Sequence, residues 1–597
     1  AEMPGSSNYD ANNPILNNNA ITNEKHHRMA SVNAGLEIDI IKGLTFRTAG
    51  SYTWQQIRSD YWDDGSTKQA MMNLSPYGYG SRDNSERSNW QITNTLNYNF
   101  DINRKHEFTV LIGQETSYWS TLKLENEWRE FPDGNFGLND VNMGKPYSWK
   151  SGESRVGLVS VFGRVSYNYE GRYLVNATLR ADGSSKFARG NKWDWFPSVS
   201  AAWRISQEKF MEPARGWLDN LKLRLGYGVA GNNKIDNNMY ATDYGSGHYA
   251  SNGNDFITFV PGTVLGNAAL VWEKTKTYNA AIDFSVLNSR INLSVDWYNN
   301  QSDNLLIKNK IPSSTGYSEQ FQNLGSIRNR GVEIVLNTVN ITNRNFSWTM
   351  DFNMAFNRSK VLSLYGGDDD KMPPVALDQI SFLVEAGKPV GQFYGLKYDG
   401  IYTTNDFDQL PDGSYKLKPG VPYRKGTNPA SVKPGDVKYV CTAGETDADG
   451  NPVFSVNDRT VIGNAAPKFT GGWSNTFTYR GFDLNIFMNF SYGNKVYNLS
   501  NERFYGPYLS NQNTISEMAN RFVLVDPATG KETTDLNRLA QLNPGDQRGL
   551  MWSVSENNKN AITDFSSYFL EDGSYLRINN ITLGYTLPKK ITKKAMI

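Results

Sequence analysis

Residues 347–357 read SWTMDFNMAFN, a stretch in which large apolar side chains occupy every second position. Polar residues fill most of the positions between its large apolar side chains, which are Trp348, Met350, Phe352, Met354 and Phe356. A period of two is typical of an extended strand with one apolar and one polar face. Residues 291–298 and 482–490 repeat the pattern. Runs of roughly 9–11 residues are long enough for a tilted strand to cross a bilayer. The pattern predicts an all-β fold, a transmembrane antiparallel β-barrel.

The same alternation and the turn residues between the runs give about 15 strand candidates along the chain. They cover residues 31–41, 44–56, 88–100, 106–118, 156–169, 173–182, 195–205, 220–230, 273–287, 290–307, 329–339, 346–358, 469–479, 482–496 and 574–587.

Short and long connections alternate between these candidates. Tight turns of the kind that Gly and Asn favour lie at residues 42–43, 103–105, 170–171, 288–289, around Asn343 and at 480–481. Long links cover residues 57–87, 119–155, 183–194, 231–272, 308–328, 359–468 and 497–573. One further short connection, residues 206–219, is predicted to hold a helical turn at 208–211.

This alternation indicates which end of the barrel faces outward. Outer-membrane barrels have short periplasmic turns and longer outer loops, whereas a β-sandwich has no reason to alternate so strictly. The tight turns are therefore predicted to face the periplasm, and the links at 359–468 and 497–573 to lie outside the cell. Loops of that length are normally functional or disordered.

The composition excludes some classes of protein. The 597 residues carry 61 basic and 60 acidic side chains, which argues against a nucleic-acid partner because such proteins normally need a basic face. The single cysteine, Cys441, allows no internal disulfide. No run of 18 apolar residues predicts a transmembrane helix. Aromatic residues make up 13%, which is compatible with a membrane girdle, a carbohydrate-binding surface or a β-sandwich.

The strand count and the two ends suggest a piece of a longer protein. Bacterial single-chain barrels have even strand numbers, and the unpaired edge of an open barrel costs several kcal/mol per backbone group in lipid. Residues 1–4 do not resemble a signal peptide, and the chain stops soon after the last strand candidate. We therefore expect further strands outside residues 1–597.

Several motifs, in order along residues 155–590, resemble one known family. They are FGRVSYNY at 162–169, YLV at 173–175, LRADGSSKF at 179–187, FPSVS at 196–200, WRIS at 203–206, LKLR at 221–224, GN at 231–232, NLGSIRNRGVEI at 323–334, DRTVIGN at 458–464, EDGSYLR at 571–577 and NITLGY at 580–585. Together they resemble the SusC/RagA-type TonB-dependent transporters of Bacteroidetes.

The resemblance implies a barrel of about 22 strands whose lumen is filled by an N-terminal plug domain. It also implies that residues 1–597 are a partial barrel domain without the plug, the TonB-contacting segment, about four initial strands and about three final strands. The partners that it implies are a SusD-like surface lipoprotein, the TonB complex through the plug, and an oligosaccharide or peptide ligand. Its localisation would be the outer membrane.

No residue is predicted to be catalytic, to bind a cofactor or to bind a metal. The four histidines (His26, His27, His106 and His248) have no partners at metal-ligand spacing, and His106 is expected in a hairpin turn. Neither a nucleophile elbow, a P-loop nor a zinc helix appears. No carboxylate pair stands out as a glycosidase pair. The sequence therefore favours a protein that is not an enzyme.

Two acidic stretches resemble cation loops. Residues 446–451 (TDADGN) alternate Asp and Asn before a glycine, as calcium loops do. They lack the regular spacing and a closing Glu, so we expect a solvated Asp-Gly turn instead. Residues 367–371 (GDDDK) are likewise expected to form a solvated loop.

Aromatic residues in the long loops are candidate platforms for sugar rings, although for each of them packing between loops is the expected role. They are Phe393, Tyr394, Tyr398, Tyr402, Tyr423, Phe504, Tyr505 and Tyr508. The residues that contact substrate are not identified by the sequence, but residues 359–468 and 497–573 are where we expect them.

The function that the resemblance implies is TonB-dependent import of a bulky polar nutrient, with glycan fragments ahead of peptides, across the bacterial outer membrane. A passive porin or an adhesin would also be a barrel with long loops. A soluble, secreted glycan-binding β-protein is a further alternative, and it would extract without detergent.

Overall fold

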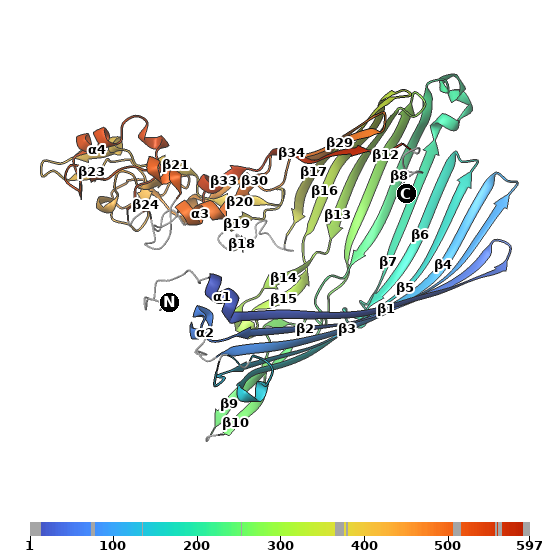
Figure 1. The fold of residues 1–597 in the computed structure, drawn as a ribbon, viewed down its shortest axis with the longest axis horizontal. Helices are drawn as coiled ribbons and strands as arrows, with labels where there is room; N and C mark the ends of the chain where they lie inside the picture. The colour runs from blue at the N-terminus through green and yellow to red at the C-terminus, as the bar shows by residue number, and fades with distance from the viewer. Residues whose placement is uncertain are drawn as a thin grey trace. The chain divides into compact units, whose positions relative to one another are not determined.

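The computed structural model describes residues 14–72, 78–133, 135, 137–251, 254–364, 375–377, 380–505, 515–555, 558 and 564–588. Fifteen strands follow one another in chain order in one antiparallel sheet (Figure 1), and each corresponds to a strand predicted from the alternation. The predicted all-β, antiparallel fold is confirmed. The chain divides into two compact units, residues 1–283 with 300–324 (unit 1) and residues 284–299 with 325–597 (unit 2).

The strands of this sheet are β1 (Ile21–Ile41), β2 (Leu44–Asp63), β3 (Tyr79–Ile102), β4 (His106–Arg129), β5 (Lys145–Tyr169), β6 (Tyr173–Ser184), β7 (Trp193–Arg204), β8 (Leu218–Asn232), β12 (Glu273–Val286), β13 (Ile291–Asp303), β16 (Ser326–Thr342), β17 (Phe346–Ser363), β28 (Phe469–Tyr479), β29 (Phe482–Tyr492) and β34 (Tyr575–Tyr585). The first five are much longer than predicted. Beyond their apolar stretches β1 to β5 continue to pair through polar residues. In these residues apolar and polar side chains do not alternate regularly, so the sequence pattern does not indicate a strand.

The predicted tight turns are present, and several use backbone that favours Gly and Asn. Asn103 and Arg104 have φ of 56°, and the Glu170–Gly171 and Arg480–Gly481 pairs also have positive φ. Paired positive φ values twist a two-residue turn in the same sense as its strands. The predicted helical turn within residues 206–219 is confirmed as two short 3-10 helices, η2 (Ile205–Gln207) and η3 (Lys209–Ala214).

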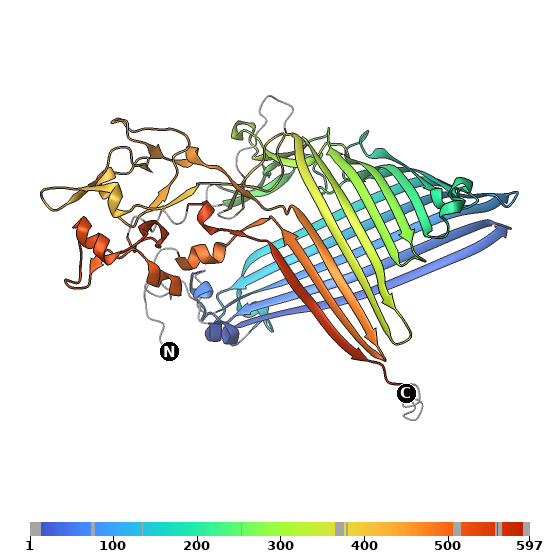
Figure 2. The same cartoon turned by 90° about the horizontal axis from the view of Figure 1, so that it is seen from above.

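One rung of unit 2 shows how the pairing separates the two faces. The register places Leu336 opposite Phe352, Phe352 opposite Trp473, Trp473 opposite Met488, and Met488 opposite Ile578. Figure 2 shows β28, β29 and β34 (orange to red) side by side. We call the face that carries this rung the apolar face.

The next rung lies on the opposite side, which we call the polar face. Asp351 pairs there with Asn337 and Ser474, and the Asn337 amide donates to Asp351 Oδ1 at 2.6 Å. On the apolar face, Phe352 and Met488 are half-buried and Trp473 and Ile578 are exposed. The apolar row is therefore open on its outer side, as contact with lipid requires.

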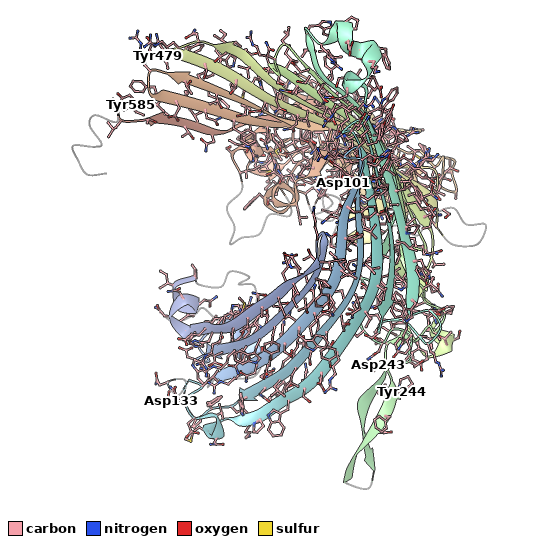
Figure 3. All side chains as sticks on the ribbon, turned by 90° about the vertical axis from the view of Figure 1, so that its right-hand side faces the viewer. Asp101, Asp133, Asp243, Tyr244, Tyr479 and Tyr585 are labelled. Carbon is pink, nitrogen blue, oxygen red and sulfur yellow. The ribbon has the colours of Figure 1, made fainter. Side chains whose placement is uncertain are left out.

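Aromatic rings gather at the turn end of the apolar face. In unit 1, Phe100 contacts both Tyr98 and Phe108 with ring centroids 5.0 Å apart, and Phe108 lies 4.9 Å from Tyr167. In unit 2, Tyr479 and Tyr585 lie at the corresponding strand ends (Figure 3). Such belts mark the membrane–water interface of transmembrane barrels.

Unit 1 carries additional elements outside the main sheet. They are α1 (Pro14–Ala20), α2 (Lys68–Met72), η1 (Val141–Met143), the hairpin of β9 (Tyr244–Ser251) and β10 (Asn254–Pro261), and a small sheet of β11 (Val264–Leu265), β14 (Leu306–Lys310) and β15 (Glu319–Asn323) with η4 (Ser313–Thr315). The predicted single strand at 290–307 was wrong in its last part, because Asn304 with φ of 58° ends β13 and the chain enters β14 of another sheet.

Most of the two longest links forms a folded body within unit 2, which we call the outer-loop domain (described residues of 380–464 and 495–572). Its strands are β19 (Ile380–Leu383), β20 (Gln392–Gly395), β21 (Tyr398–Ile401), β22 (Phe407–Gln409), β23 (Tyr415–Leu417), β24 (Tyr423–Arg424), β25 (Val437–Tyr439), β26 (Val453–Phe454), β27 (Thr460–Asn464), β30 (Lys495–Tyr497), β31 (Val525–Asp526), β32 (Lys531–Glu532) and β33 (Leu570–Asp572), with β18 (Val375–Leu377) paired to β19. Its helices are α3 (Leu499–Tyr505), α4 (Leu536–Leu542), η5 (Thr404–Asp406), η6 (Pro429–Ser431), η7 (Val456–Asp458), η8 (Ser516–Asn520), η9 (Gln547–Gly549) and η10 (Ser567–Phe569). Within the described residues, no helix is both long and apolar enough to span a membrane.

Candidate functional site

The polar face of unit 1 holds a charged cluster centred on Arg180 of β6. Pairing places Glu115 of β4 opposite Ser160 of β5, and Ser160 opposite Asp182 of β6. Arg180 Nε donates to Asp182 Oδ1 at 2.7 Å. Its Nη2 donates to Ser160 Oγ at 2.8 Å and to Glu115 Oε1 at 3.3 Å. The guanidinium is therefore fixed by side chains from three adjacent strands.

Two residues of β3 extend this cluster across a fourth strand. Gln91 Nε2 and Thr93 Oγ1 both donate to Glu115 Oε2, at 2.9 and 3.1 Å. Hydrogen bonds to charged groups are stronger than neutral ones, so the cluster is rigid. It presents guanidinium, carboxylate, amide and hydroxyl groups on one wall, which suits recognition of a polar, uncharged or zwitterionic molecule.

The outer-loop domain packs around its own aromatic core. Its fully buried side chains include Phe522 and Tyr439 at 1% exposure, and Ile401 and Leu539 at 0%. A second, smaller core surrounds Tyr402. The described residues of these long links are therefore folded and not disordered.

Three of the eight aromatic residues that are candidate sugar platforms belong to these cores. Phe393, Tyr402 and Tyr423 are buried. The Tyr402 hydroxyl donates to the Pro422 carbonyl at 2.6 Å, and burial raises the pKa of Tyr402. For these three rings the expected packing role is confirmed.

The other candidate rings are more accessible. Tyr398 and Tyr505 are half-buried and meet Tyr568 edge-on, with ring centroids 4.7 and 6.3 Å apart. Tyr394 is half-buried, Phe504 of α3 is 51% exposed, and Tyr508 lies outside the described residues. Of the described candidates, Phe504 offers the most ring surface to a ligand.

Buried polar residues hold the outer-loop domain together. Asn558, 1% exposed, accepts from the Val437 backbone N at 2.8 Å and donates to the carbonyls of Gly435 and Ser553. The bonds to Val437 and Gly435 join segments more than a hundred residues apart in the sequence. Buried polar groups with every partner in place favour one arrangement of the chain.

A pocket of about 450 Å³ opens on this domain. Met518, Phe522, Leu524, Val525 and Val554 give it an apolar wall, to which Arg521 and Glu532 add one charge of each sign. An apolar wall with a few polar groups is the usual lining of a small-molecule site.

Comparison with known proteins assigns the family. The family model for the TonB-dependent receptor-like β-barrel matches residues 3–473. This chain belongs to the TonB-dependent receptors. The outer-membrane localisation predicted from the alternation is confirmed, and the soluble alternative is excluded.

Individual relatives support the SusC/RagA type predicted from the motifs. A TonB-dependent receptor of Formosa agariphila is 28% identical over 99% of this chain and 55% of its own length. The TonB-dependent receptor SusC of Bacteroides thetaiotaomicron is 27% identical over 86% of this chain and 46% of its own length. The chain thus spans about half the length of the curated relatives that it matches.

A solved structure shares the fold. The RagAB peptide importer in its "open-open" state superposes with a TM-score of 0.75 at 22% identity, covering 99% of this chain and 58% of that chain. In this receptor barrel the polar face is the lumen side and the apolar face is the lipid side.

The loop at residues 446–451 has the structure of an Asp-centred turn. Asp447 Oδ1 accepts from the backbone N of Asp449 and Asn451, at 2.9 and 2.8 Å. Its Oδ2 accepts from the Tyr423 hydroxyl at 2.7 Å, and these bonds, the Tyr423 bond foremost, lower the pKa of Asp447 to about 2. Both carboxylate oxygens of Asp447 therefore already accept hydrogen bonds that stabilise the turn. The other acidic stretch, residues 367–371, lies outside the described residues.

The histidines lie in different places. His26 and His27 are in β1, His106 begins β4, and His248 is in β9. His106 was wrongly placed in a turn: its ring packs 4.8 Å from that of Tyr169 and its Nδ1 lies 2.8 Å from the Tyr167 hydroxyl, within the aromatic belt. The described residues contain no cluster of three or more potential metal ligands.

Sequence reasoning missed the interactions that fix one family motif. Asp458, fully buried at the end of η7, accepts from the backbone N of Thr442, Ala443 and Ser455 at 2.5, 2.7 and 2.7 Å. Burial alone would raise the pKa of Asp458, but these N–H groups lower it below its usual value. The Ser455–Asp458 spacing is that of a capping box, which was the available signal.

Proposed function

We propose that this barrel imports a bulky polar nutrient across the outer membrane in a TonB-dependent manner, with glycan fragments as the cargo. The observation that carries the proposal is the lumen-side cluster around Arg180, together with family membership. A wall of hydroxyl, amide and ion-paired groups exchanges hydrogen bonds with a hydrated solute without leaving any group unsatisfied. An apolar cargo would gain nothing from it.

Partners follow from the family. A SusD-like surface lipoprotein would capture cargo at the outer-loop side, and the TonB complex would act through a plug domain. Energy would then come from the inner-membrane proton gradient. The wall would perform no covalent chemistry, so the barrel would not be an enzyme.

Peptides are the second candidate cargo. The related RagAB structure is described as a peptide importer, and the Arg180 cluster presents both signs of charge, as peptide termini would require. A passive porin or an adhesin remains the alternative of another class, and dependence on TonB separates it from the proposal.

The test is uptake of labelled oligosaccharides and peptides by cells that carry the complete receptor. We expect glycan uptake that is abolished when TonB is deleted, and a fall of about 10-fold or more for Arg180→Ala with Glu115→Ala, since charged hydrogen bonds each contribute about 1.5–3 kcal/mol. Uptake that persists without TonB would support a porin. Uptake of peptides but not of oligosaccharides would show that the cargo is a peptide and not a glycan fragment.

A matched control is Arg47→Ala, which removes a cation from the polar face of β2 that makes no ion pair with the described residues. We expect uptake close to that of the unmodified receptor. An equal loss in both variants would show that general charge on the wall, and not the Arg180 cluster, matters for cargo.

A further inference from the structure

Four cations lie together on the apolar face of unit 2, where it leaves the membrane. Arg330 pairs with Arg358 and Arg328 pairs with Lys360 across β16 and β17, in two successive rungs on the same face as the apolar row. The rung before them is the apolar pair Val332 and Phe356. Like charges directly opposite each other destabilise a strand pair, so the fold tolerates an unfavourable arrangement at this point.

The depth of the cluster follows from counting along β17. From Phe346, next to the tight turn, to Phe356 the strand rises about 33 Å, or about 25 Å along the normal at the usual tilt, which is the height of the apolar band of such barrels. Phe356 contacts Phe469, and Phe469 contacts Tyr492, with ring centroids 5.9 and 5.0 Å apart. These rings form the outer belt, and Arg358 follows one rung, about 7 Å, beyond it.

The four cations have little counter-charge. None of them forms an ion pair with any residue that the structure describes. Among the described residues, Arg358 Nη1 donates to the carbonyls of Asn357 and Lys468 and to no carboxylate. Arg328 Nε is buried and has no hydrogen-bond acceptor within the described part of the chain. A buried donor without a partner is costly, and an anion would satisfy it.

The cluster lines a pocket and not a flat surface. A cavity of about 310 Å³ is bounded by the four cations, Ser359, Gly387 and Pro389. The segment that forms its side is fixed by backbone bonds, from Val361 N to Lys388 O at 2.9 Å and from Gly387 N to Val361 O at 2.8 Å. The volume corresponds to about ten water molecules, which is enough for a phosphate and part of the sugar to which it is attached.

Unit 1 provides a contrast at a similar position. Arg58 and Arg82 also lie on the apolar face beyond its outer aromatic residues, next to a pocket. Both form ion pairs with Asp60, with Arg58 Nη2 at 3.0 Å and Arg82 Nε at 2.9 Å from its carboxylate. Among the described residues, the lack of counter-charge at the unit 2 cluster is therefore not shared by the basic residues of unit 1 at a similar position along their strands.

We propose that Arg328, Arg330, Arg358 and Lys360 bind the phosphate of a phosphorylated lipid headgroup in the outer leaflet. Basic residues at the membrane surface attract anionic headgroups, and guanidinium groups bind phosphate in a bidentate manner. The position excludes cargo, because the site faces the bilayer and not the lumen. The bound headgroup neutralises the two like-charge rungs and fixes β16, β17 and residues 387–390 at the membrane boundary.

The experiment titrates the complete receptor in detergent with diphosphorylated lipid A and with dephosphorylated lipid A, and counts bound lipid by native mass spectrometry. For the unmodified receptor we expect preferential binding of the phosphorylated form. For Arg330→Gln with Arg358→Gln we expect about 30-fold weaker binding, the effect of removing two cations near an anionic headgroup. Equal binding by the variant, or of both lipids, would overturn the proposal.

Three further variants test the charge and the location of the site. Arg330→Lys with Arg358→Lys keeps the charge and should retain most of the binding. Arg58→Gln with Arg82→Gln removes the two cations that pair with Asp60 in unit 1 and should leave binding within about twofold. If Arg330→Gln with Arg358→Gln fails to fold, as judged by heat-dependent gel migration, Lys360→Gln alone should still weaken binding about fivefold.

Two outcomes would assign the cluster to another anion. Complete displacement of lipid A by inorganic phosphate would show a free-phosphate site and overturn the assignment to lipid. The acidic run Asp368–Asp370 follows β17 in the sequence, and its conversion to three asparagines should leave lipid binding unchanged. An increase of more than about threefold would identify these carboxylates as the counter-charge and overturn the proposal.

Discussion

The wall and the outer-loop domain of unit 2 are built from the same chain but are stabilised differently. In the wall, each apolar side chain has neighbours on adjacent strands and remains half-exposed on its outer side, as for Phe352 and Met488. In the outer-loop domain, Phe522 and Leu539 are fully enclosed by protein. The wall needs lipid to complete its burial, whereas the outer-loop domain behaves like a small water-soluble protein.

This difference predicts which substitutions should change the stability of each region. On the wall, the effect of a substitution depends on which face the residue occupies, because consecutive residues of a strand face lipid and lumen water in turn. In the outer-loop domain, the effect depends on how completely the side chain is buried, whatever its position along the chain. A substitution on one face of the wall or in a core of the outer-loop domain, set against a neighbour on the other face or at the surface, therefore tests this difference.

The largest effect is expected in the outer-loop domain. Phe522→Ala should lower its free energy of unfolding by about 3–5 kcal/mol, because the ring is 1% exposed and its removal takes its packing contacts away from the core. Limited proteolysis with increasing temperature should show earlier cleavage in residues 515–555, while the heat-dependent gel migration of the barrel is unchanged. Phe504→Ala, at an exposed ring, should shift cleavage little; an equal shift would contradict the packing described for the two rings.

On the wall, Met350→Arg should lower the free energy of unfolding by about 2–4 kcal/mol, because Met350 lies on the lipid face near the middle of the apolar band, where a cation is most costly. Its neighbour Thr349 faces the lumen, so Thr349→Arg should change stability by less than about 1 kcal/mol. Urea titration of folding into lipid vesicles measures both variants. Equal costs would show that the two faces do not differ in their contact with lipid.

A smaller effect is expected at the buried carboxylate of η7. Asp458→Asn keeps the shape of the side chain but replaces one carboxylate oxygen by an NH₂ group. This group would face a backbone N–H from which the carboxylate now accepts a hydrogen bond. We expect a loss of about 1–3 kcal/mol in the outer-loop domain. Hydrogen exchange of the Thr442 and Ala443 amides should rise in this variant and stay unchanged in Asn457→Ala, because the Asn457 side chain bonds to Glu445 and not to these two amides.

The smallest effect is a pH dependence at the 446–451 turn. The pKa of Asp447 is lowered to about 2 in the folded state, so its stabilising contribution is present above about pH 4 and is lost as the pH falls through about 2. Asp447→Asn should therefore loosen the turn at neutral pH and match the unmodified protein near pH ~2. Hydrogen exchange of the Asp449 and Asn451 amides across this acid-to-neutral range tests the prediction, and a variant effect that persists at the acid end would contradict the assignment.

The wall could be predicted from sequence because its signal is local. Alternation in residues 347–357 and the turns at 42–43, 170–171 and 480–481 depend only on neighbouring residues, and the structure has the strands and turns that they indicate. The prediction failed where polar residues continue the pairing, as in β1 to β5, and where one residue such as Asn304 ends a strand early.

The outer-loop domain could not be predicted for the opposite reason. Its decisive bonds, such as the Thr404 backbone N to Gln547 Oε1 at 2.9 Å, join residues 143 positions apart. The Arg180 cluster has an intermediate character, since its strands were correct but the register that brings Glu115 to Arg180 was unknown. The four basic residues between 328 and 360 can be read from the sequence, but only the strand register places them in two adjacent rungs on one face.

The length of the first strands has a consequence for recognition of this receptor by other molecules. β3 and β4 remain paired over 24 residues each, about 80 Å of ribbon, of which the bilayer needs only about ten residues per strand. More than half of the hairpin therefore extends beyond the lipid as rigid sheet. An antibody or a bacteriophage that approaches there meets a surface composed of side chains from neighbouring strands, so its epitope is conformational and no linear peptide should reproduce it.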